Sequence, residues 1–191
     1  MTCRFCFAKY RTKWSECLSV GDAKKIIEQA AGLGIEKINF AGGEPLLYPY
    51  LTDLIFHTSE LGLLTSVVTN GSLLTKNWIN QHKTALNCIG LSIDSIDTKI
   101  NLAAGRAVKG KYPITELVYR HVGDWIHTSG IGLKINTVAS QYNLSVDLND
   151  FLLALNPQRW KVFQALSLEG VNSRKSGSFV ISTDQFNEFI Q

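Results

Sequence analysis

The sequence has 191 residues, of which 45% are hydrophobic and 18% are charged, and this composition is typical of one folded domain with a substantial core. A formal net charge of +3 is too small to indicate nucleic-acid binding, and no apolar run reaches the length of about eighteen residues that a membrane span needs. Four cysteines without a secretory signal sequence indicate a reducing compartment, so we expect a cytoplasmic protein.

Short runs rich in β-branched and aromatic residues alternate with amphipathic helical stretches. The predicted strands are residues 36–40, 65–69, 89–93, 133–138 and 160–168. The predicted helices are residues 20–33 (capped by Ser19), a segment after Pro49, a short segment after Thr75, a segment from Pro113 to Gly130, residues 146–155 and a stretch that starts near Thr183. This alternation predicts parallel strands joined by right-handed crossovers, which is the α/β class.

The helical stretches and the strands each have an apolar side. We expect the helices to pack through their apolar stripes, which are Ile26, Ile27, Ala30 and Leu33 in the first, Leu51, Leu54, Ile55, Thr58 and Leu61 in the second, and Leu117, Val118, Val122, Trp125 and Ile126 in the fourth. Successive residues of a strand point to opposite faces, and in each predicted strand one face is apolar while the other carries polar groups. The polar faces hold Lys37 and Asn39, then Ser66 and Asn70, Ser92 and Asp94, Lys134 and Asn136, and Arg159 and Lys161. A doubly wound sheet needs two apolar faces, so the pattern favours a partly open (β/α) barrel with a polar interior.

Cys3 and Cys6 form a Cys-x2-Cys motif at the start of the chain. Such a pair could be half of a zinc site, a redox dithiol or two unrelated thiols. A zinc site needs a second pair, and Cys17 and Cys88 are far apart in the sequence, so we interpret these two as structural or incidental. A thioredoxin-like dithiol follows a strand, and no strand is predicted before Cys3.

The segment Ala41-Gly42-Gly43-Glu44-Pro45 directly follows the first predicted strand. Two glycines allow the backbone to pass close to a ligand, and Glu44 places a carboxylate at the carboxyl end of the strand, where α/β proteins bind their ligands. An ordinary turn between a strand and a helix would explain the glycines but would not explain Glu44 and Pro45 as well.

Taken together, these motifs resemble those of the radical S-adenosylmethionine (SAM) enzymes, which have a Cys-x3-Cys-x2-Cys motif followed by a Gly-Gly-Glu-Pro turn. The resemblance is closest to the viperin family, including its prokaryotic members, and it extends through essentially the whole chain. It depends on Cys6-Phe7, residues 36–45, Asn70-Gly71-Ser72-Leu73, Ser92-Ile93-Asp94-Ser95, Gly105-Arg106, Lys134-Ile135-Asn136 and residues 154–164.

The resemblance implies a partial (β/α)6-type radical SAM barrel that binds a [4Fe–4S] cluster and SAM. It implies a 5′-deoxyadenosyl radical that takes the 4′-hydrogen of a ribonucleoside triphosphate such as CTP. Loss of the 3′-hydroxyl then gives the 3′-deoxy-3′,4′-didehydro nucleotide, an antiviral terminator of RNA synthesis. The expected partners are the nucleotide and an electron donor such as a flavodoxin or ferredoxin, with no direct contact to nucleic acid and no evident membrane partner.

The resemblance also assigns expected roles to individual residues. Cys3 and Cys6 would bind iron, while Gly42, Gly43 and Glu44 would bind the SAM amino group. Ser92 and Arg106 would meet the SAM carboxylate, and Asn70 would meet its ribose. The residues expected around the nucleotide are Lys37, Lys134, Asn136, Arg159 and Lys161.

The chain departs from the family pattern in two places. The first cysteine of the motif would lie two places before Met1, and the first strand of the barrel would precede it. At the other end, Gln191 lies inside the predicted helix that starts near Thr183, whereas the family continues with a segment that closes over the nucleotide. We therefore expect a single radical SAM domain, residues 1–191, that is incomplete at both termini. Two alternatives stay open. One is a nucleotide- or SAM-binding module without a cluster, and the other is a radical SAM enzyme that acts on a deazapurine precursor or a peptide.

Overall fold

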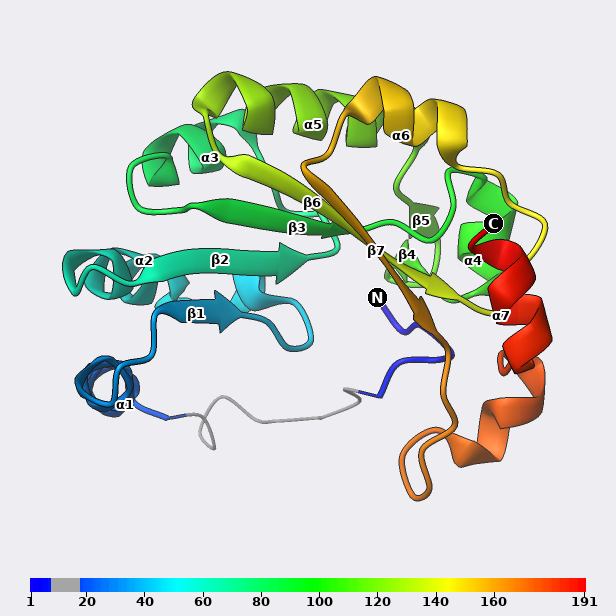
Figure 1. Cartoon of the computed structure of the whole chain (residues 1–191), viewed down its shortest axis with the longest axis horizontal. Helices are drawn as coiled ribbons and strands as arrows, with labels where there is room; N and C mark the ends of the chain where they lie inside the picture. The colour runs from blue at the N-terminus through cyan, green and yellow to red at the C-terminus, as the bar shows by residue number, and fades with distance from the viewer. Residues whose placement is uncertain (8–17) are drawn as a thin grey trace.

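Five parallel strands form one sheet in the order β1-β2-β3-β6-β7 (Figure 1). The computed structural model describes residues 1–7 and 18–191, except for the side chains of residues 174–176. The strands are β1 (Lys37–Phe40), β2 (Leu64–Thr69), β3 (Cys88–Ser92), β6 (Gly132–Ala139) and β7 (Arg159–Gln164). Each of the five lies within a few residues of a predicted strand, and every pairing in the sheet is parallel, as predicted.

One face of this sheet is covered by helices that connect the strands. The helices α2 (Leu51–Glu60), α3 (Lys76–His82), α5 (Glu116–Ser129) and α6 (Asn149–Leu155) share one hydrophobic core with the sheet. Ile89, Leu91, Leu133 and Ile135 are fully buried in this core. The apolar strand faces therefore pack against helices, as the alternation of the sequence predicted.

The helix α1 (Val20–Gly32) packs at the margin of the fold (Figure 1). Ile27 forms a small second cluster with Leu54 of α2 and with Leu63, the residue just before β2. Of the predicted stripe of α1, Ile26 and Leu33 are 51% and 84% exposed. The expectation that they are buried is wrong, because α1 contacts the rest of the described chain along a narrow seam.

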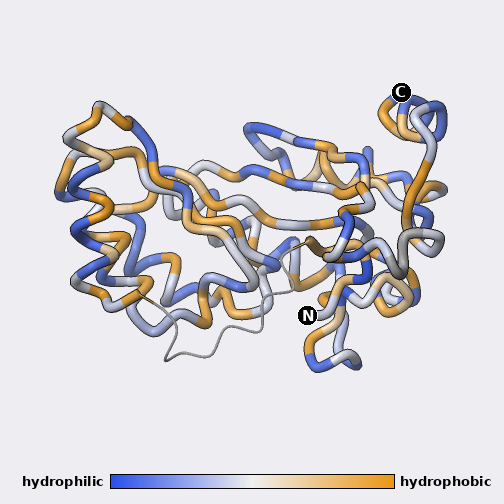
Figure 2. Tube along the Cα trace, turned by 90° about the horizontal axis from the view of Figure 1, so that it is seen from below, coloured by the Kyte–Doolittle hydropathy of each residue, from blue (hydrophilic) through white to orange (hydrophobic). Residues whose placement is uncertain are grey.

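In α2 and α5, too, some residues of the predicted apolar stripe are exposed. Leu61, which follows α2, is exposed, and so are Leu117 and Val118 in the first turn of α5. Figure 2, which views the chain from below, shows orange and blue residues mixed along the helical turns on that side.

Local hydrogen bonds explain where several helices begin and end. The Ser19 hydroxyl accepts from the Asp22 backbone N–H at 3.1 Å, which confirms the predicted cap of α1. The Thr75 hydroxyl caps α3 in the same way, by accepting from the Trp78 N–H. The predicted helix 146–155 starts later, at Asn149, and its N-cap residue Leu148 makes no side-chain capping bond. Just before the helix, the Asp147 carboxylate accepts from the Asn149 N–H and so favours a turn over an earlier helical start.

The sequence patterns missed four short elements between residues 97 and 178. They are α4 (Thr98–Ala103), the antiparallel pair β4 (Ala107–Val108) and β5 (Tyr112–Pro113), and the 3-10 helix η3 (Ser173–Ser178). Each element is too short to show a hydrophobic period. The predicted strand 160–168 ends earlier than expected, at Gln164, and the chain then continues through η3 to α7 (Thr183–Phe189).

None of the helices in the described part of the chain has both the length and the apolar composition that spanning a bilayer requires.

Candidate active site

The sequence-predicted residues gather on the face of the sheet that the core helices leave uncovered and at the carboxyl ends of its strands. The segment 1–7 lies below β4 and β7 in Figure 1, away from α5 and α6. The turn after β1 contains Gly42, Gly43 and Glu44, and Asn70 directly follows β2. Ser92 is the last residue of β3. The parallel topology therefore brings these segments to one edge of the sheet.

The cysteine loop is a tight turn held against the end of α4. The Cys6 N–H donates to the Cys3 carbonyl at 3.2 Å, and the N–H groups of Thr2 and Arg4 donate to the carbonyls of Gly105 and Ala104. Gly105 has a φ of 77°, and a Cβ there would lie 2.5 Å from the Thr2 carbonyl oxygen. A residue with a side chain would therefore push the cysteine loop away from this segment.

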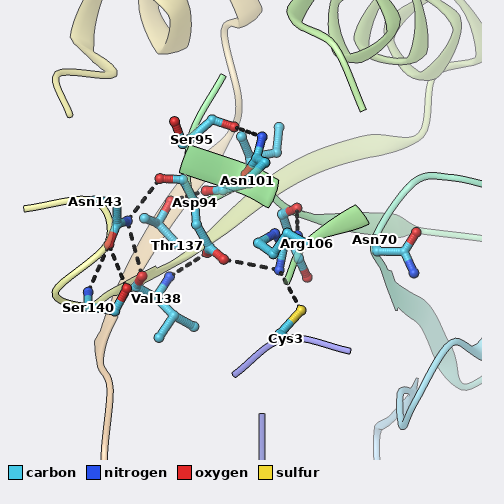
Figure 3. Close-up of polar contacts among 12 residues, drawn as sticks. Cys3, Asn70, Asp94, Ser95, Asn101, Arg106, Thr137, Val138, Ser140 and Asn143 are labelled. Carbon is cyan, nitrogen blue, oxygen red and sulfur yellow. Dashed lines mark hydrogen bonds and ion pairs between the residues drawn. The ribbon is translucent and has the colours of Figure 1, made fainter. Parts of the chain in front are cut away.

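Both loop cysteines are free thiols and half-buried. Burial raises the pKa of the Cys3 thiol, and the nearby Arg106 guanidinium opposes this rise. Nη1 of Arg106 lies 3.9 Å from the Cys3 sulfur, so a cation faces the thiol that would act as a thiolate ligand (Figure 3).

Cys3 and Cys6 fit two of the three iron ligands that the motif implies. Within residues 1–7 and 18–191, no group of three His, Cys, Asp or Glu side chains is placed to hold a metal ion. The position expected for the first cysteine precedes Met1, and Cys17 lies outside the described residues. The donor chemistry that is present, two thiols beside a guanidinium, suits an iron–sulfur cluster.

The Glu44 carboxylate forms three hydrogen bonds within the protein. Oε1 accepts from the Thr69 hydroxyl at 2.6 Å and from the Leu46 N–H at 3.3 Å, and Oε2 accepts from the Asn70 N–H at 2.9 Å. These bonds join the turn after β1 to the end of β2. Glu44 therefore has a structural role that the sequence did not show, because Thr69 is 25 residues away.

The two glycines before Glu44 lie in the open. No atom lies within 4 Å of the position that a Cβ would take at Gly42 or at Gly43. Their backbone is exposed at the carboxyl edge, where a ligand can approach it. Beside this turn, the Asn70 side-chain oxygen accepts from the Ser72 N–H, which leaves the Asn70 amide nitrogen available.

Arg106 lies at the centre of a buried polar network (Figure 3). Nη1 pairs with the Asp94 carboxylate at 3.1 Å, and Nη2 donates to the Ser92 carbonyl. The Asp94 carboxylate also accepts from the Val138 N–H at 2.8 Å. Burial opposes the charge of Arg106, but Asp94 and, to a smaller degree, Tyr119 raise the pKa of the guanidinium above its ordinary value. The Nε of Arg106 is buried and forms no hydrogen bond within the described chain.

The polar face of the sheet brings together the residues that were expected around the nucleotide. Lys134 pairs in register with Arg159, and Asn136 pairs with Lys161. A Cβ on Gly90 would lie 3.1 Å from the Lys134 side chain and 3.4 Å from the Asn136 amide nitrogen. The side chains of Lys134 and Asn136 on β6 therefore pack close over Gly90, where the side chain of another residue would hold them away.

Four cations share this face. Burial lowers the pKa of Lys134, and Lys161, Lys37 and Arg159 lower it further by repulsion. No ion pair with a carboxylate forms at any of these four residues within the described chain. Like charges gathered without a counter-charge favour the binding of an anion. The Asn136 side-chain oxygen is also buried there without a hydrogen-bond partner among the described residues.

The sequence did not predict a role for four residues of this region. Asp94 was placed on the polar face but was given no role, and Gly90 was not noticed. A single glycine inside a β-rich run is a signal of close approach that could have identified it. Cys88, interpreted as incidental, lies near enough to Lys134 to influence its pKa. The Asn39 side chain accepts from the Ser66 hydroxyl at 2.8 Å on the same face.

Comparison with known families and proteins agrees with this geometry. The family model described as the radical SAM superfamily matches residues 1–120. Curated relatives named S-adenosylmethionine-dependent nucleotide dehydratase include one from Flammeovirga pacifica, which is 42% identical over 195 residues. Another, from Lacinutrix mariniflava, is 40% identical, and one from Danio rerio is 36% identical.

These alignments include at least 99% of the present chain. The chain spans 67%, 41% and 54% of the length of the three relatives, in the same order.

Solved structures confirm the fold. Streptococcus suis SuiB bound to S-adenosylmethionine has a TM-score of 0.79 at 20% identity, over 99% of this chain and 43% of that one. TsrM from Kitasatospora setae, solved with cobalamin and a [4Fe–4S] cluster, has a TM-score of 0.64 at 13% identity, over 80% of this chain and 32% of that one. The sheet and its helices therefore have the partial-barrel fold that the sequence predicted.

Proposed function

The chain belongs to the radical SAM superfamily and, within it, to the S-adenosylmethionine-dependent nucleotide dehydratases, and from this premise we propose that it acts on a ribonucleoside triphosphate. The proposed product is the 3′-deoxy-3′,4′-didehydro nucleotide. One observation supports a nucleotide over an uncharged substrate. Lys37, Lys134, Arg159 and Lys161 gather on the open face of the sheet without a carboxylate partner in the described chain.

The triphosphate would lie across β6 and β7. Arg159 presents a planar fork of donors that suits a phosphate, and Lys134 and Lys161 add point charges. Because Gly90 has no side chain, Lys134 and Asn136 lie close over the sheet at this point, so both can face one ligand. The Asn136 side-chain oxygen, buried and without a partner in the described chain, is an acceptor for a sugar hydroxyl. The cations thus face the phosphates of the proposed substrate, and Asn136 faces its sugar.

SAM would bind at the carboxyl edge of the sheet, next to Cys3 and Cys6. The open backbone of Gly42 and Gly43 would receive the SAM amino group, and Glu44 would attract it by charge. Arg106 is a held cation with an unused Nε donor, which suits a carboxylate. Asn70 would donate from its amide nitrogen to a ribose oxygen.

When bound, the cluster and SAM would supply the radical chemistry that removes the 4′-hydrogen of the nucleotide, and loss of the 3′-hydroxyl as water would take up one further electron and one proton. The side chains of this chain contribute binding and orientation. The cations hold the phosphates on one side, and the strand ends hold SAM on the other, so the nucleotide sugar is confined between them. An external reductant, such as a flavodoxin or ferredoxin, would supply the electrons.

The test is anaerobic reconstitution with iron and sulfide, followed by incubation with SAM, dithionite and each of the four ribonucleoside triphosphates. The proposal expects 5′-deoxyadenosine and a nucleotide product lighter by one water, as measured by mass spectrometry. Iron uptake and 5′-deoxyadenosine release without any nucleotide product would indicate a radical SAM enzyme with another substrate. Nucleotide binding without iron uptake would indicate a binding module instead.

A further inference from the structure

The buried side chain of Asn172 joins two parts of the chain that lie far apart in the sequence. Its Nδ2 donates to the Phe5 carbonyl at 3.1 Å and to the Leu166 carbonyl at 3.2 Å. Its Oδ1 accepts from the Leu168 N–H at 2.7 Å. The side chain is 3% exposed, so both amide donors and one acceptor are used in a place that water does not reach.

Phe5 lies between Cys3 and Cys6, at the centre of the cysteine loop. On one side of the loop, backbone hydrogen bonds join Thr2 and Arg4 to Gly105 and Ala104. Asn172 contacts the loop from another segment of the chain, 167 positions away from Phe5. The cysteine loop is therefore held from two sides, and one of the two attachments is a single side chain.

The other two hydrogen bonds of the Asn172 side chain hold the segment that follows β7. Ala165 makes a last hydrogen bond to Ala139, one residue after β7 ends. Beyond it, the Leu166 carbonyl and the Leu168 N–H bond to Asn172 instead of a neighbouring strand. The chain continues from Lys161 on β7 to this point without another element between them. One amide thus fixes the cysteine loop against the strand proposed to bind nucleotide.

We infer that Asn172 is a positioning residue that holds the Cys3–Cys6 loop at a set distance from β7. The roles of cluster and nucleotide in this inference rest on the proposed function. The clamp itself is a property of the described chain. The position requires an amide, because it must donate to two carbonyls and accept from one N–H. A carboxylate of the same shape would face two carbonyl oxygens, and alanine would leave both without a donor.

The first test uses the cluster-free protein and measures how fast each thiol reacts with iodoacetamide, by mass spectrometry of the digested chain. Asn172→Ala and Asn172→Asp are expected to raise the reaction rates of Cys3 and Cys6 by about two- to tenfold, the factor that the loss of the one ordinary hydrogen bond to Phe5 gives the opening equilibrium of the loop. Cys88, on the sheet, is the internal reference and should not change. The alanine variant adds no charge, so its result does not depend on electrostatic effects on the thiols.

A control variant separates the clamp from general loss of stability. Ile79→Ala removes fully buried core volume in α3, far from both segments in the sequence, and should accelerate the three thiols together if it accelerates them at all. The inference is overturned if the Asn172 variants leave Cys3 and Cys6 unchanged relative to Cys88, or if all three thiols change in proportion.

The second test measures release of cluster iron to a ferrous chelator after reconstitution. Both Asn172 variants should lose iron faster than the unaltered chain, and Ile79→Ala should lose it at the unaltered rate below its own melting transition. Equal rates in all the proteins would contradict the inference. If the unaltered chain takes up no cluster, the proposed function fails, while the thiol measurement still decides the role of Asn172.

Discussion

Arg106 and Asp94 form an ion pair of 3.1 Å in which both side chains are buried. Asp94 lies just beyond β3, and Arg106 lies between α4 and β4. The pair therefore attaches the short α4–β5 segment to the sheet. It also holds the Arg106 guanidinium beside Cys3, at the edge where SAM is proposed to bind.

Removal of one partner of this pair should be costly. Asp94→Ala leaves a buried guanidinium without its counter-charge, and we expect the free energy of unfolding to fall by about 3–5 kcal/mol. The double variant Asp94→Leu with Arg106→Met should be less destabilised than Asp94→Ala, because it leaves no isolated charge. Urea unfolding of the three proteins measures this, and equal losses in the single and double variants would show that packing, rather than charge, dominates.

Lys161→Ala should weaken the binding of a ribonucleoside triphosphate by about 1.5–3 kcal/mol, the range of a hydrogen bond to a charged group. SAM binding should stay almost unchanged, because Lys161 lies on the sheet face and not at the carboxyl edge. Calorimetric titration with each ligand measures both affinities. Lys25→Ala, an exposed lysine of α1, is the matched control. Equal loss of both ligands would mean that Lys161 supports the fold instead.

Gly90→Val should block the same site without unfolding the chain. Valine suits a strand, but its side chain would displace Lys134, Asn136 and Val68, because a Cβ alone would already lie 3.1–3.4 Å from all three. We expect at least a tenfold loss of nucleotide affinity, about 1.4 kcal/mol, with SAM binding retained. Gly32→Ala is the control, because no atom lies within 4 Å of a Cβ at that position. Unchanged nucleotide binding in the Gly90 variant would place the phosphates elsewhere.

The stability of the chain should fall in mild acid because of His82. The ring is fully buried and stacks on Trp78 and Phe56. Nδ1 lies 2.7 Å from the Trp78 carbonyl and therefore carries the proton, while Nε2 lies 3.1 Å from the Thr52 hydroxyl and accepts from it. Burial lowers the pKa of His82 below its ordinary value of 6.5, and the hydrogen bond to Trp78 only partly opposes this.

The direction of this pH dependence follows from the number of protons that the folded and the unfolded chain each bind at His82. Below pH 6.5 the unfolded chain gains a proton at His82 before the folded chain does, so protonation favours unfolding. The contribution of the neutral ring is fully present above pH 6.5 and is lost as the pH falls toward the lowered pKa. Urea unfolding between pH 8 and pH 5 should show this decline, and His82→Phe should reduce it. A decline of the same size in His82→Phe would assign it to other groups.

The sequence predicted the sheet and the polar face because both depend on local alternation. The register of β6 with β7 confirms the shared face of Lys134 and Arg159. The sequence did not predict the contacts that join distant segments. Nothing near Glu44 indicates the hydroxyl of Thr69, and nothing near Asp94 indicates that a short hairpin brings Arg106 to it. Such pairs are selected by the tertiary fold, and their members look like ordinary polar residues of a turn.

The early end of β7 has a similar origin. Residues 165–168 retain the apolar composition of a strand, but Asn172 provides hydrogen bonds that a neighbouring strand would otherwise supply. The exposed side chains of α1 show the converse case, in which a periodic stripe is present but the fold offers little surface to cover it.

The wide sequence separations around the cysteine loop affect when the site can form during synthesis. Cys3 meets Arg106 after 103 further residues, and Phe5 meets Asn172 after 167. Contacts of this range form late, because a long loop must close before any of them contributes. Until the ribosome has added Arg106, the cysteine loop has neither partner, and until it has added Asn172 the loop lacks the second. Iron delivered before that point would meet a loop that is held incompletely, so we expect productive metal loading to follow synthesis and folding of the chain through Asn172.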